Sequence, residues 1–332
     1  MAEPLTMSKK SSFNLSDKTG LTYGSQGVKR GIIWKVDRFA QHDGPGIRTA
    51  LYFKGCLLKC LWCDNPEGQT SEPSLVLAKT ICNGCGQCVK ACTSQALALL
   101  QTDDSSTIQV NRSSCNLCGA CAPICPTGAL QILGQSYTVS ELLAILEKDR
   151  LIHKRSGGGL TCTGGEPLYQ SDFLMGLLSE CRRLNIHTAI ETSGYVDEMV
   201  FKDVLQLVDY LFIDLKHIDN EKHKRLTGNS NARILSNTLL ASSTLQSRDK
   251  ALTIRMVVIP GVNDGQNISD LTDFLRSLPL VTSVELLPYH RYGVQKYDLL
   301  GRRHGLPEAE PPSAEVMDKY KKHLAGYGLH VV

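Results

Sequence analysis

The stretch that decides the fold is CLLKCLWC at residues 56–63, in which Cys56, Cys60 and Cys63 follow the spacing CxxxCxxC. Three thiolates bind three irons of a cubane [4Fe–4S] cluster and leave the fourth iron open for an external ligand. A cluster that only transfers electrons usually has four cysteine ligands. The alternative is a zinc site of three cysteines with His42 as its fourth ligand.

The composition limits the class of protein. The chain has 332 residues, 42% of them hydrophobic and 21% charged, which is typical of a globular protein with one large or two smaller domains. A net charge of +3 is too small for the concentrated basic surface of a nucleic-acid-binding protein. There is no apolar run of the ~18–20 residues that cross a bilayer, and the first twenty residues lack the apolar segment of a secretory signal. We therefore expect neither a nucleic-acid nor a membrane partner.

The thirteen cysteines are the unusual feature of this composition. Disulfide frameworks are typical of small secreted domains, so clustered cysteines in a long chain without a signal favour metal or cluster ligation. Eleven of the cysteines fall in three short runs of sequence, and only Cys162 and Cys181 lie outside these runs. We interpret both as structural residues.

Two further runs each follow the bacterial ferredoxin pattern CxxCxxCxxxC. In two-cluster ferredoxins the fourth cysteine of each run ligates the other cluster. One [4Fe–4S] cluster is thereby assigned to Cys82, Cys85, Cys88 and Cys125, and the other to Cys115, Cys118, Cys121 and Cys92. Zinc knuckles are the alternative. Residues 77–135, which carry both runs, are predicted to form a small ferredoxin-type insert held together by its clusters.

The rest of the chain alternates between strand and helix patterns. Residues 1–29 are expected to be a flexible extension, and residues 30–76 and 136–332 one α/β domain. Strands are predicted at 31–39, 49–55, 159–164, 187–192, 210–215, 252–259 and 283–289, and helices at 139–152, 171–184, 197–206, 231–244, 266–277 and 313–324.

This alternation predicts a parallel sheet covered by helices, a full or partial (β/α) barrel, with a doubly wound open sheet as the alternative. Polar residues stand at the carboxyl ends of these strands, where such folds carry their chemistry: Glu166, Glu191, Asp214, Lys216, Arg255 and His290.

The cysteine motif, together with the preceding DGPGIR at residues 43–48, resembles the radical S-adenosylmethionine (SAM) enzymes that activate glycyl radical enzymes. The pyruvate formate-lyase activating enzyme belongs to this family. The resemblance runs from about residue 31 to the C-terminus. It implies a partial (β/α)6-type radical SAM barrel with an inserted domain of two [4Fe–4S] clusters.

The same resemblance implies the residues that contact SAM. The GGEP element at 164–167 binds the methionyl amino group in the family, which suits a carboxylate and close backbone approach. The other implied contacts lie in further family motifs or flank Cys63, the last cysteine of the first motif. The full set of implied SAM contacts is Trp62, Asp64, Gly164, Gly165, Glu166, Thr192, Asp214, Leu215, Lys216, Arg255 and His290. Many relatives carry His in place of Asp64, so only a backbone contact is carried over there. Glu191 stands where the family often has Asp, which puts any cation-binding role of that position in doubt.

By the same resemblance, the chain is an oxidoreductase that cleaves SAM reductively and takes a hydrogen from a backbone glycine of a partner enzyme. The chemistry belongs to the cofactors, three [4Fe–4S] clusters and SAM, so no side chain is expected to act as a catalytic acid or base. Ferredoxin or flavodoxin is the expected electron donor. We expect a monomer in an anaerobic cytoplasm. The alternatives are a radical SAM enzyme with a different substrate and an electron-transfer subunit without catalysis.

Overall fold

The computed structural model describes residues 29–101 and 106–332. The extension predicted at residues 1–29 therefore lies almost wholly outside the described residues. The described chain forms two compact units. One comprises Ala78–Ile132, and the other comprises residues 29–77 and Leu133–Val332.

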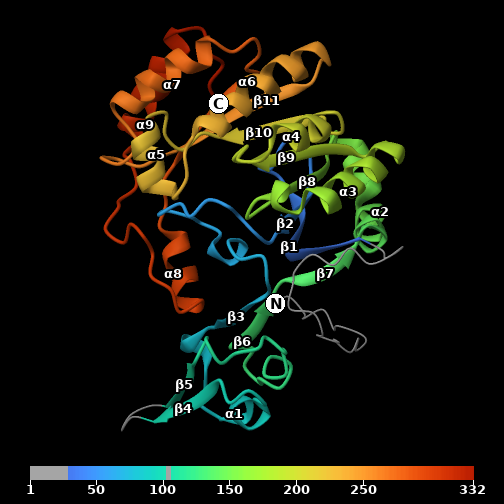
Figure 1. The fold of residues 1–332 in the computed structure, drawn as a ribbon, viewed down its shortest axis with the longest axis vertical. Helices are drawn as coiled ribbons and strands as arrows, with labels where there is room; N and C mark the ends of the chain where they lie inside the picture. Colours follow the sequence, from blue (N-terminus) through green and yellow to red (C-terminus); the bar gives the residue numbers. More distant parts are fainter. Residues whose placement is uncertain (1–28, 102–105) are drawn as a thin grey trace. The chain divides into compact units, whose positions relative to one another are not determined.

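The larger unit is built on one eight-stranded sheet (Figure 1). Its strands are β1 (Arg30–Ala40), β2 (Arg48–Phe53), β7 (Gln135–Thr138), β8 (Gly159–Gly164), β9 (His187–Thr192), β10 (Tyr210–Asp214), β11 (Ala251–Val258) and β12 (Ser283–Pro288). Their order is β12-β11-β10-β9-β8-β2-β1-β7. The strands from β2 to β12 pair in parallel, whereas β1 pairs antiparallel with both β2 and β7. The parallel strands follow chain order with no reversal, so the sheet lacks the switch point of a doubly wound fold. The predicted α/β partial barrel is confirmed.

Helices cover this sheet, and α2, α3 and α6 pack against β8, β9 and β11 respectively (Figure 1). The helices are α2 (Val139–Ser156), α3 (Ser171–Arg183), α4 (Glu198–Leu205), α5 (Asn220–Thr227), α6 (Ala232–Ser247), α7 (Gln266–Arg276), α8 (Tyr292–Leu299) and α9 (Ala314–Gly326). Short 3-10 turns are η1 (Pro66–Gly68) and η3 (Pro167–Gln170). The sequence predicted all of these helices except α5 and α8. Cys162 and Cys181 are fully buried in the core between the sheet and the helices. No helix of the described residues is long and apolar enough to cross a membrane.

The smaller unit has little regular structure. It contains η2 (Lys79–Ile81), α1 (Gln87–Ala91) and the antiparallel pair β4 (Leu97–Gln101) and β5 (Ser106–Val110). Strand β3 (Ser74–Leu77) precedes it, and β6 (Leu130–Leu133) ends it. The described part of this unit buries too few apolar residues to form a core of its own. They are Cys88, Ala96, Leu97, Ile108, Cys121, Ala129 and Leu130. Such a module depends on bound cofactors for stability.

The DGPGIR segment forms a tight loop before β2. Arg48 is fully buried, and its guanidinium donates to Pro45 O (2.9 Å), within its own loop, and to Thr161 Oγ1 (2.5 Å) on β8. Thr161 Oγ1 in turn donates to Asp43 O (2.7 Å). Arg48, the first residue of β2, and Thr161 therefore join this loop to β8.

A glycine at position 46 is required by close backbone packing. Gly46 has φ of +69°, and a Cβ atom there would lie 2.4 Å from Gly158 N and 2.5 Å from Ser156 O. Both neighbours are backbone atoms at the end of α2 and cannot move independently. The loop and the end of α2 therefore fit only without a side chain.

We predict that Gly46→Ala destabilises the protein by at least ~1 kcal/mol more than Gly157→Ala, because overpacking adds ~1–3 kcal/mol to the strain of a left-handed residue. Gly157 is the matched control, since it has φ of +72° and a Cβ atom there would meet nothing within 4 Å. Denaturant unfolding of both variants measures the difference. Equal destabilisation would show that the packing around Gly46 is looser than described.

Candidate active site

The three cysteines of CxxxCxxC lie on an irregular loop, residues 54–65, that we call the cysteine loop. It begins where β2 ends and contains neither helix nor strand. Leu58 is its anchor in the main core, with 2% of its surface exposed. Gly55 N donates to both Gly68 O (2.7 Å) and Thr70 O (2.9 Å). Bonds from distant segments thus determine the shape of this loop.

The three cysteines of this loop are partly buried. Burial raises the pKa of Cys56 and Cys63, and it raises the pKa of Cys60 to about 12. The nearby ammonium group of Lys216 opposes this effect at Cys60 and Cys63 by favouring their thiolates. Free thiols are therefore protonated at neutral pH, and binding iron must release their protons. Three partly buried thiols and one cation suit the negative charge of a cluster held by three thiolates.

The cysteine loop interlocks with the GGEP turn through backbone atoms. Gly165 N donates to Phe53 O (2.9 Å), and Glu166 N donates to Gly55 O (2.7 Å). A Cβ atom on Gly165 would lie 2.2 Å from Gly68 O and 2.5 Å from Gly55 O. Only glycine permits this approach, so the GGEP turn and the start of the cysteine loop form a single unit.

The Glu166 carboxylate is buried, with 2% of the residue exposed, and four hydrogen bonds hold it. Oε1 accepts from Thr192 Oγ1 (2.7 Å) and Leu168 N (3.2 Å), and Oε2 accepts from Ser193 N (2.9 Å) and Ser193 Oγ (2.6 Å). Burial raises the pKa of Glu166, and these hydrogen bonds oppose the shift. A carboxylate offers about four lone-pair sites, so in this structure Glu166 joins the GGEP turn to the turn that follows β9. The sequence did not single out Ser193 as a partner of Glu166.

Asp214 and Lys216 form an ion pair at the end of β10. Lys216 Nζ lies 2.7 Å from Asp214 Oδ2, and 14% of the Lys216 side chain is exposed. Burial lowers the pKa of Lys216, but Asp214, Cys60 and Cys63 together raise it by more, so the net shift is upward and the lysine stays charged. Leu215 is different, because its side chain is buried in the core and its N–H donates to Arg255 O (2.9 Å).

Arg255 is bound on several sides by protein groups. It forms ion pairs with Glu191 and Glu285 and lies over the ring of Phe212, 3.7 Å from the ring centroid. Its Nη2 also donates to His42 O (3.2 Å). Burial lowers the pKa of Arg255, but the carboxylates of Glu191, Glu285 and Asp214 together raise it by more. Glu191 therefore serves as an internal counter-charge to Arg255.

Asp64 lies between two residues from the C-terminal part of the chain. Lys296, on α8, donates to Asp64 O (2.7 Å) and Oδ2 (3.1 Å), and His290 Nδ1 lies 3.8 Å from Asp64 Oδ1. Gly293 permits α8 to approach, since a Cβ there would lie 3.0 Å from Asp64 Cα. Trp62, next to the last cysteine, is buried. The sequence predicted neither α8 nor the role of Lys296, because a helix of eight residues is too short to show a clear apolar periodicity.

Comparisons with known proteins agree with this geometry. The model of the radical SAM superfamily matches residues 113–275, and that of a 4Fe-4S dicluster domain matches residues 81–129. The 4-hydroxyphenylacetate decarboxylase activating enzyme of Clostridioides difficile (strain 630) is 41% identical over 285 residues, which cover 84% of this chain and 88% of that protein. This chain belongs to the radical SAM activating enzymes of glycyl radical enzymes.

Other activating enzymes are similar to nearly the same degree. The isethionate sulfite-lyase activating enzyme of Oleidesulfovibrio alaskensis is 41% identical over 285 residues, 84% of this chain and 89% of that protein. The choline trimethylamine-lyase activating enzyme of the same organism is 38% identical over 280 residues, 82% of this chain and 88% of that protein. Sequence identity alone does not distinguish between these three named specificities.

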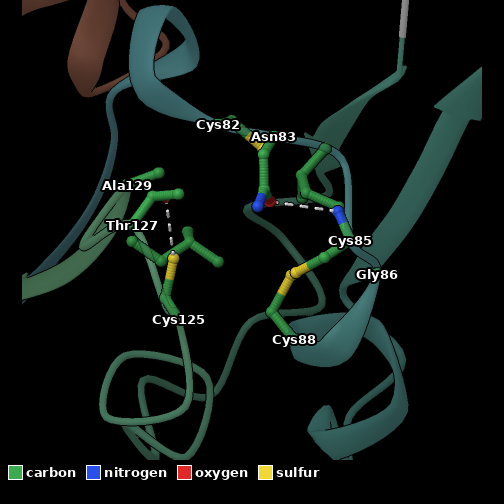
Figure 2. A pocket seen from close by; sticks show the side chains of 10 residues that line it. Cys82, Asn83, Cys85, Gly86, Cys88, Cys125, Thr127 and Ala129 are labelled. Carbon is green, nitrogen blue, oxygen red and sulfur yellow. Dashed lines mark hydrogen bonds between the residues drawn. The ribbon is translucent and has the colours of Figure 1, made fainter.

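The insert of this activating enzyme contains a cavity lined by cysteines from both ferredoxin runs (Figure 2). Its cysteines are Cys82, Cys85, Cys88 and Cys125. This is the set that the two-cluster ferredoxin pattern assigns to one cluster, so the residues present fit a [4Fe–4S] group. Burial raises the pKa of Cys125, but hydrogen bonds from donors that include Leu130 N and Thr127 Oγ1 lower it by more. The net shift is downward and favours the thiolate. Across residues 29–101 and 106–332, no three His, Cys, Asp or Glu side chains converge as ligands of a single metal ion.

We predict that Glu166→Gln destabilises the activating enzyme by ~1–3 kcal/mol, because the amide NH₂ would face hydrogen-bond donors inside a buried site. The control is Glu147→Gln, since Glu147 forms an exposed pair with Arg150 and should change stability by less than ~1 kcal/mol. Denaturant unfolding measures both. Equal stability of the two variants would mean that the four bonds to Glu166 contribute nothing.

Proposed function

We propose that this chain activates a partner glycyl radical enzyme. When bound, the cluster on Cys56, Cys60 and Cys63 would supply the electron that cleaves SAM into methionine and a 5′-deoxyadenosyl radical. That radical takes a hydrogen from a backbone glycine of the partner, and the products are 5′-deoxyadenosine and a glycyl radical. The reaction class is that of an oxidoreductase.

The observation that carries the proposal is the interlock between the cysteine loop and the GGEP turn. The bonds Gly165 N to Phe53 O and Glu166 N to Gly55 O bring the expected cluster ligands beside the motif expected to bind the methionyl end of SAM. An amino acid that chelates the open iron would lie at this junction. Burial and then the charge of the Glu166 carboxylate raise the pKa of the Cys56 thiol.

The remaining side chains would bind and orient SAM around this junction. The proposed contacts are Trp62, Asp64, Gly164, Gly165, Glu166, Thr192, Asp214, Leu215, Lys216, Arg255 and His290. Their contributions differ in kind. Leu215 can offer only backbone atoms, because its side chain is in the core. Lys216 supplies positive charge for the SAM carboxylate, and Arg255 acts through the acids that it holds in place.

The insert would carry two further [4Fe–4S] clusters, for a total of three. The second set is Cys115, Cys118, Cys121 and Cys92. These clusters would relay electrons from ferredoxin or flavodoxin, and docking of the partner is the alternative role. Oxygen-sensitive clusters suit an anaerobic cytoplasm, and we propose a monomer there.

The direct test is product formation after anaerobic reconstitution. With SAM and dithionite, we expect 5′-deoxyadenosine and, with one of the probe enzymes, an electron paramagnetic resonance (EPR) signal of a glycyl radical. The probes are 4-hydroxyphenylacetate decarboxylase, isethionate sulfite-lyase and choline trimethylamine-lyase. The absence of 5′-deoxyadenosine from a fully iron-loaded protein would refute the proposal. Cleavage of SAM without any glycyl radical would favour a different substrate.

Iron content tests the ligand assignment. Three cubane clusters predict about twelve irons per chain, and changing Cys56, Cys60 and Cys63 together to Ala should leave about eight. SAM cleavage should be lost in the same variant. Retention of about twelve irons would show that other residues hold the third cluster.

We predict that Lys216→Met keeps its iron and binds SAM roughly ten- to hundredfold more weakly, as expected for the loss of ~1–3 kcal/mol from a bond to a charged group. The matched control is Lys250→Met. Lys250 pairs with Asp209 at 2.8 Å, but this pair lies where β10 and β11 begin, at the opposite edge of the sheet. SAM titration followed by the cluster's EPR signal measures both. Equal affinities in the two variants would place Lys216 outside the SAM site.

A further inference from the structure

We propose that Asn229 is a positioning residue for the cysteine loop, and this inference rests on the proposed SAM site. Asn229 lies just beyond α5, a helix that the family motifs do not include. Its side-chain Nδ2 donates to Leu57 O (2.8 Å), one residue after the first cluster cysteine. The contact spans 172 residues of sequence.

The end of α5 adds two backbone bonds to the same loop. Lys59 N donates to Thr227 O (2.7 Å), and Leu61 N donates to Leu226 O (3.0 Å). The last carbonyls of a helix have no donors within the helix, so here they are free to bind the loop. Together with Asn229, they hold alternate residues of the loop on both sides of Cys60.

Asn229 is itself oriented by two further partners. Its backbone carbonyl lies 2.6 Å from Nδ1 of His223, a fully buried residue of α5. Its Oδ1 accepts from Tyr195 OH (3.3 Å). Because Oδ1 faces a hydroxyl donor and Nδ2 faces a carbonyl, the amide has one preferred orientation.

These contacts connect the cysteine loop to the turn after β9. Tyr195 follows Ser193 in that turn, and Ser193 binds the Glu166 carboxylate. Leu57 has 45% of its surface exposed, so side-chain packing restrains this part of the loop only weakly. Asn229 thus sets the distance between the cluster ligands and the turn that holds the GGEP glutamate.

The test uses Asn229→Asp in the full-length chain, which keeps the size and the acceptor but replaces the donor to Leu57 O with a carboxylate oxygen. Gln246→Glu is the matched control, because Gln246 also donates a side-chain amide to a backbone carbonyl, Pro279 O (3.1 Å), at an exposed position on α6. Tyr195→Phe is the milder variant, since it removes only the group that orients the Asn229 amide.

Hydrogen exchange of the peptide covering residues 57–63 is measured in the protein before reconstitution, and SAM affinity after it. In Asn229→Asp we expect about tenfold faster exchange at this peptide and about tenfold weaker SAM binding, with full iron content. Tyr195→Phe should give a smaller change in the same direction, and Gln246→Glu no change. If the peptide covering residues 57–63 exchanged at the wild-type rate in both Asn229→Asp and Tyr195→Phe, the proposal would be overturned.

The two readouts separate this proposal from the proposed function. If the wild-type protein failed to bind SAM, the proposed function would fall, whereas the exchange comparison would still test the Asn229 contact. If Asn229→Asp lost its cluster, faster exchange in Tyr195→Phe would support the positioning role, and unchanged exchange in that variant would overturn it.

Discussion

The structure depends on the way in which an irregular loop is held against the end of a parallel sheet. The cysteine loop forms neither helix nor strand, so most of its backbone hydrogen bonds go to other segments. Phe53 O and Gly55 O accept bonds from the GGEP turn, and the end of α5 accepts bonds from Lys59 and Leu61. The glycines allow backbone to meet backbone, which gives a more rigid junction than contacts between long side chains.

The charges around this junction are divided between two separate groups. Arg255 is neutralised by Glu191 and Glu285, whereas Lys216 has Asp214 as its one ion-pair partner among the described residues. Lys216 also favours the thiolates of Cys60 and Cys63. A lysine with limited exposure therefore favours these two thiolates, whereas the arginine is held by carboxylates on the neighbouring strands.

Much of the fold could be predicted from the sequence, because its strands are apolar runs that end at polar residues. Strands β8 and β9 have the predicted bounds, 159–164 and 187–192. Helix α5 was missed, because NEKHKRLT has no apolar face and the helix is stabilised by its contacts with the cysteine loop. Its ends do carry a signal, since Asp219 caps the first turn and Gly228 ends the helix in a left-handed conformation.

The candidate site was less predictable than the fold. The cysteine spacing is local and could be read directly, but ion pairs and hydrogen bonds depend on segments that meet only in three dimensions. The pairing of Arg255 with Glu285, the contact of Lys296 with Asp64 and the bond from Asn229 to Leu57 are of this kind. Local motifs identify residue types, whereas the sheet order decides which of them meet.

The central claim is that three cysteines hold a cubane whose fourth iron is open to SAM. Mössbauer spectroscopy of protein reconstituted with ⁵⁷Fe tests it most directly, in a variant whose eight insert cysteines are replaced by Ala so that only the cluster on the cysteine loop contributes. The account predicts that adding SAM changes the signal of one iron in four. A spectrum that SAM leaves unchanged would contradict it.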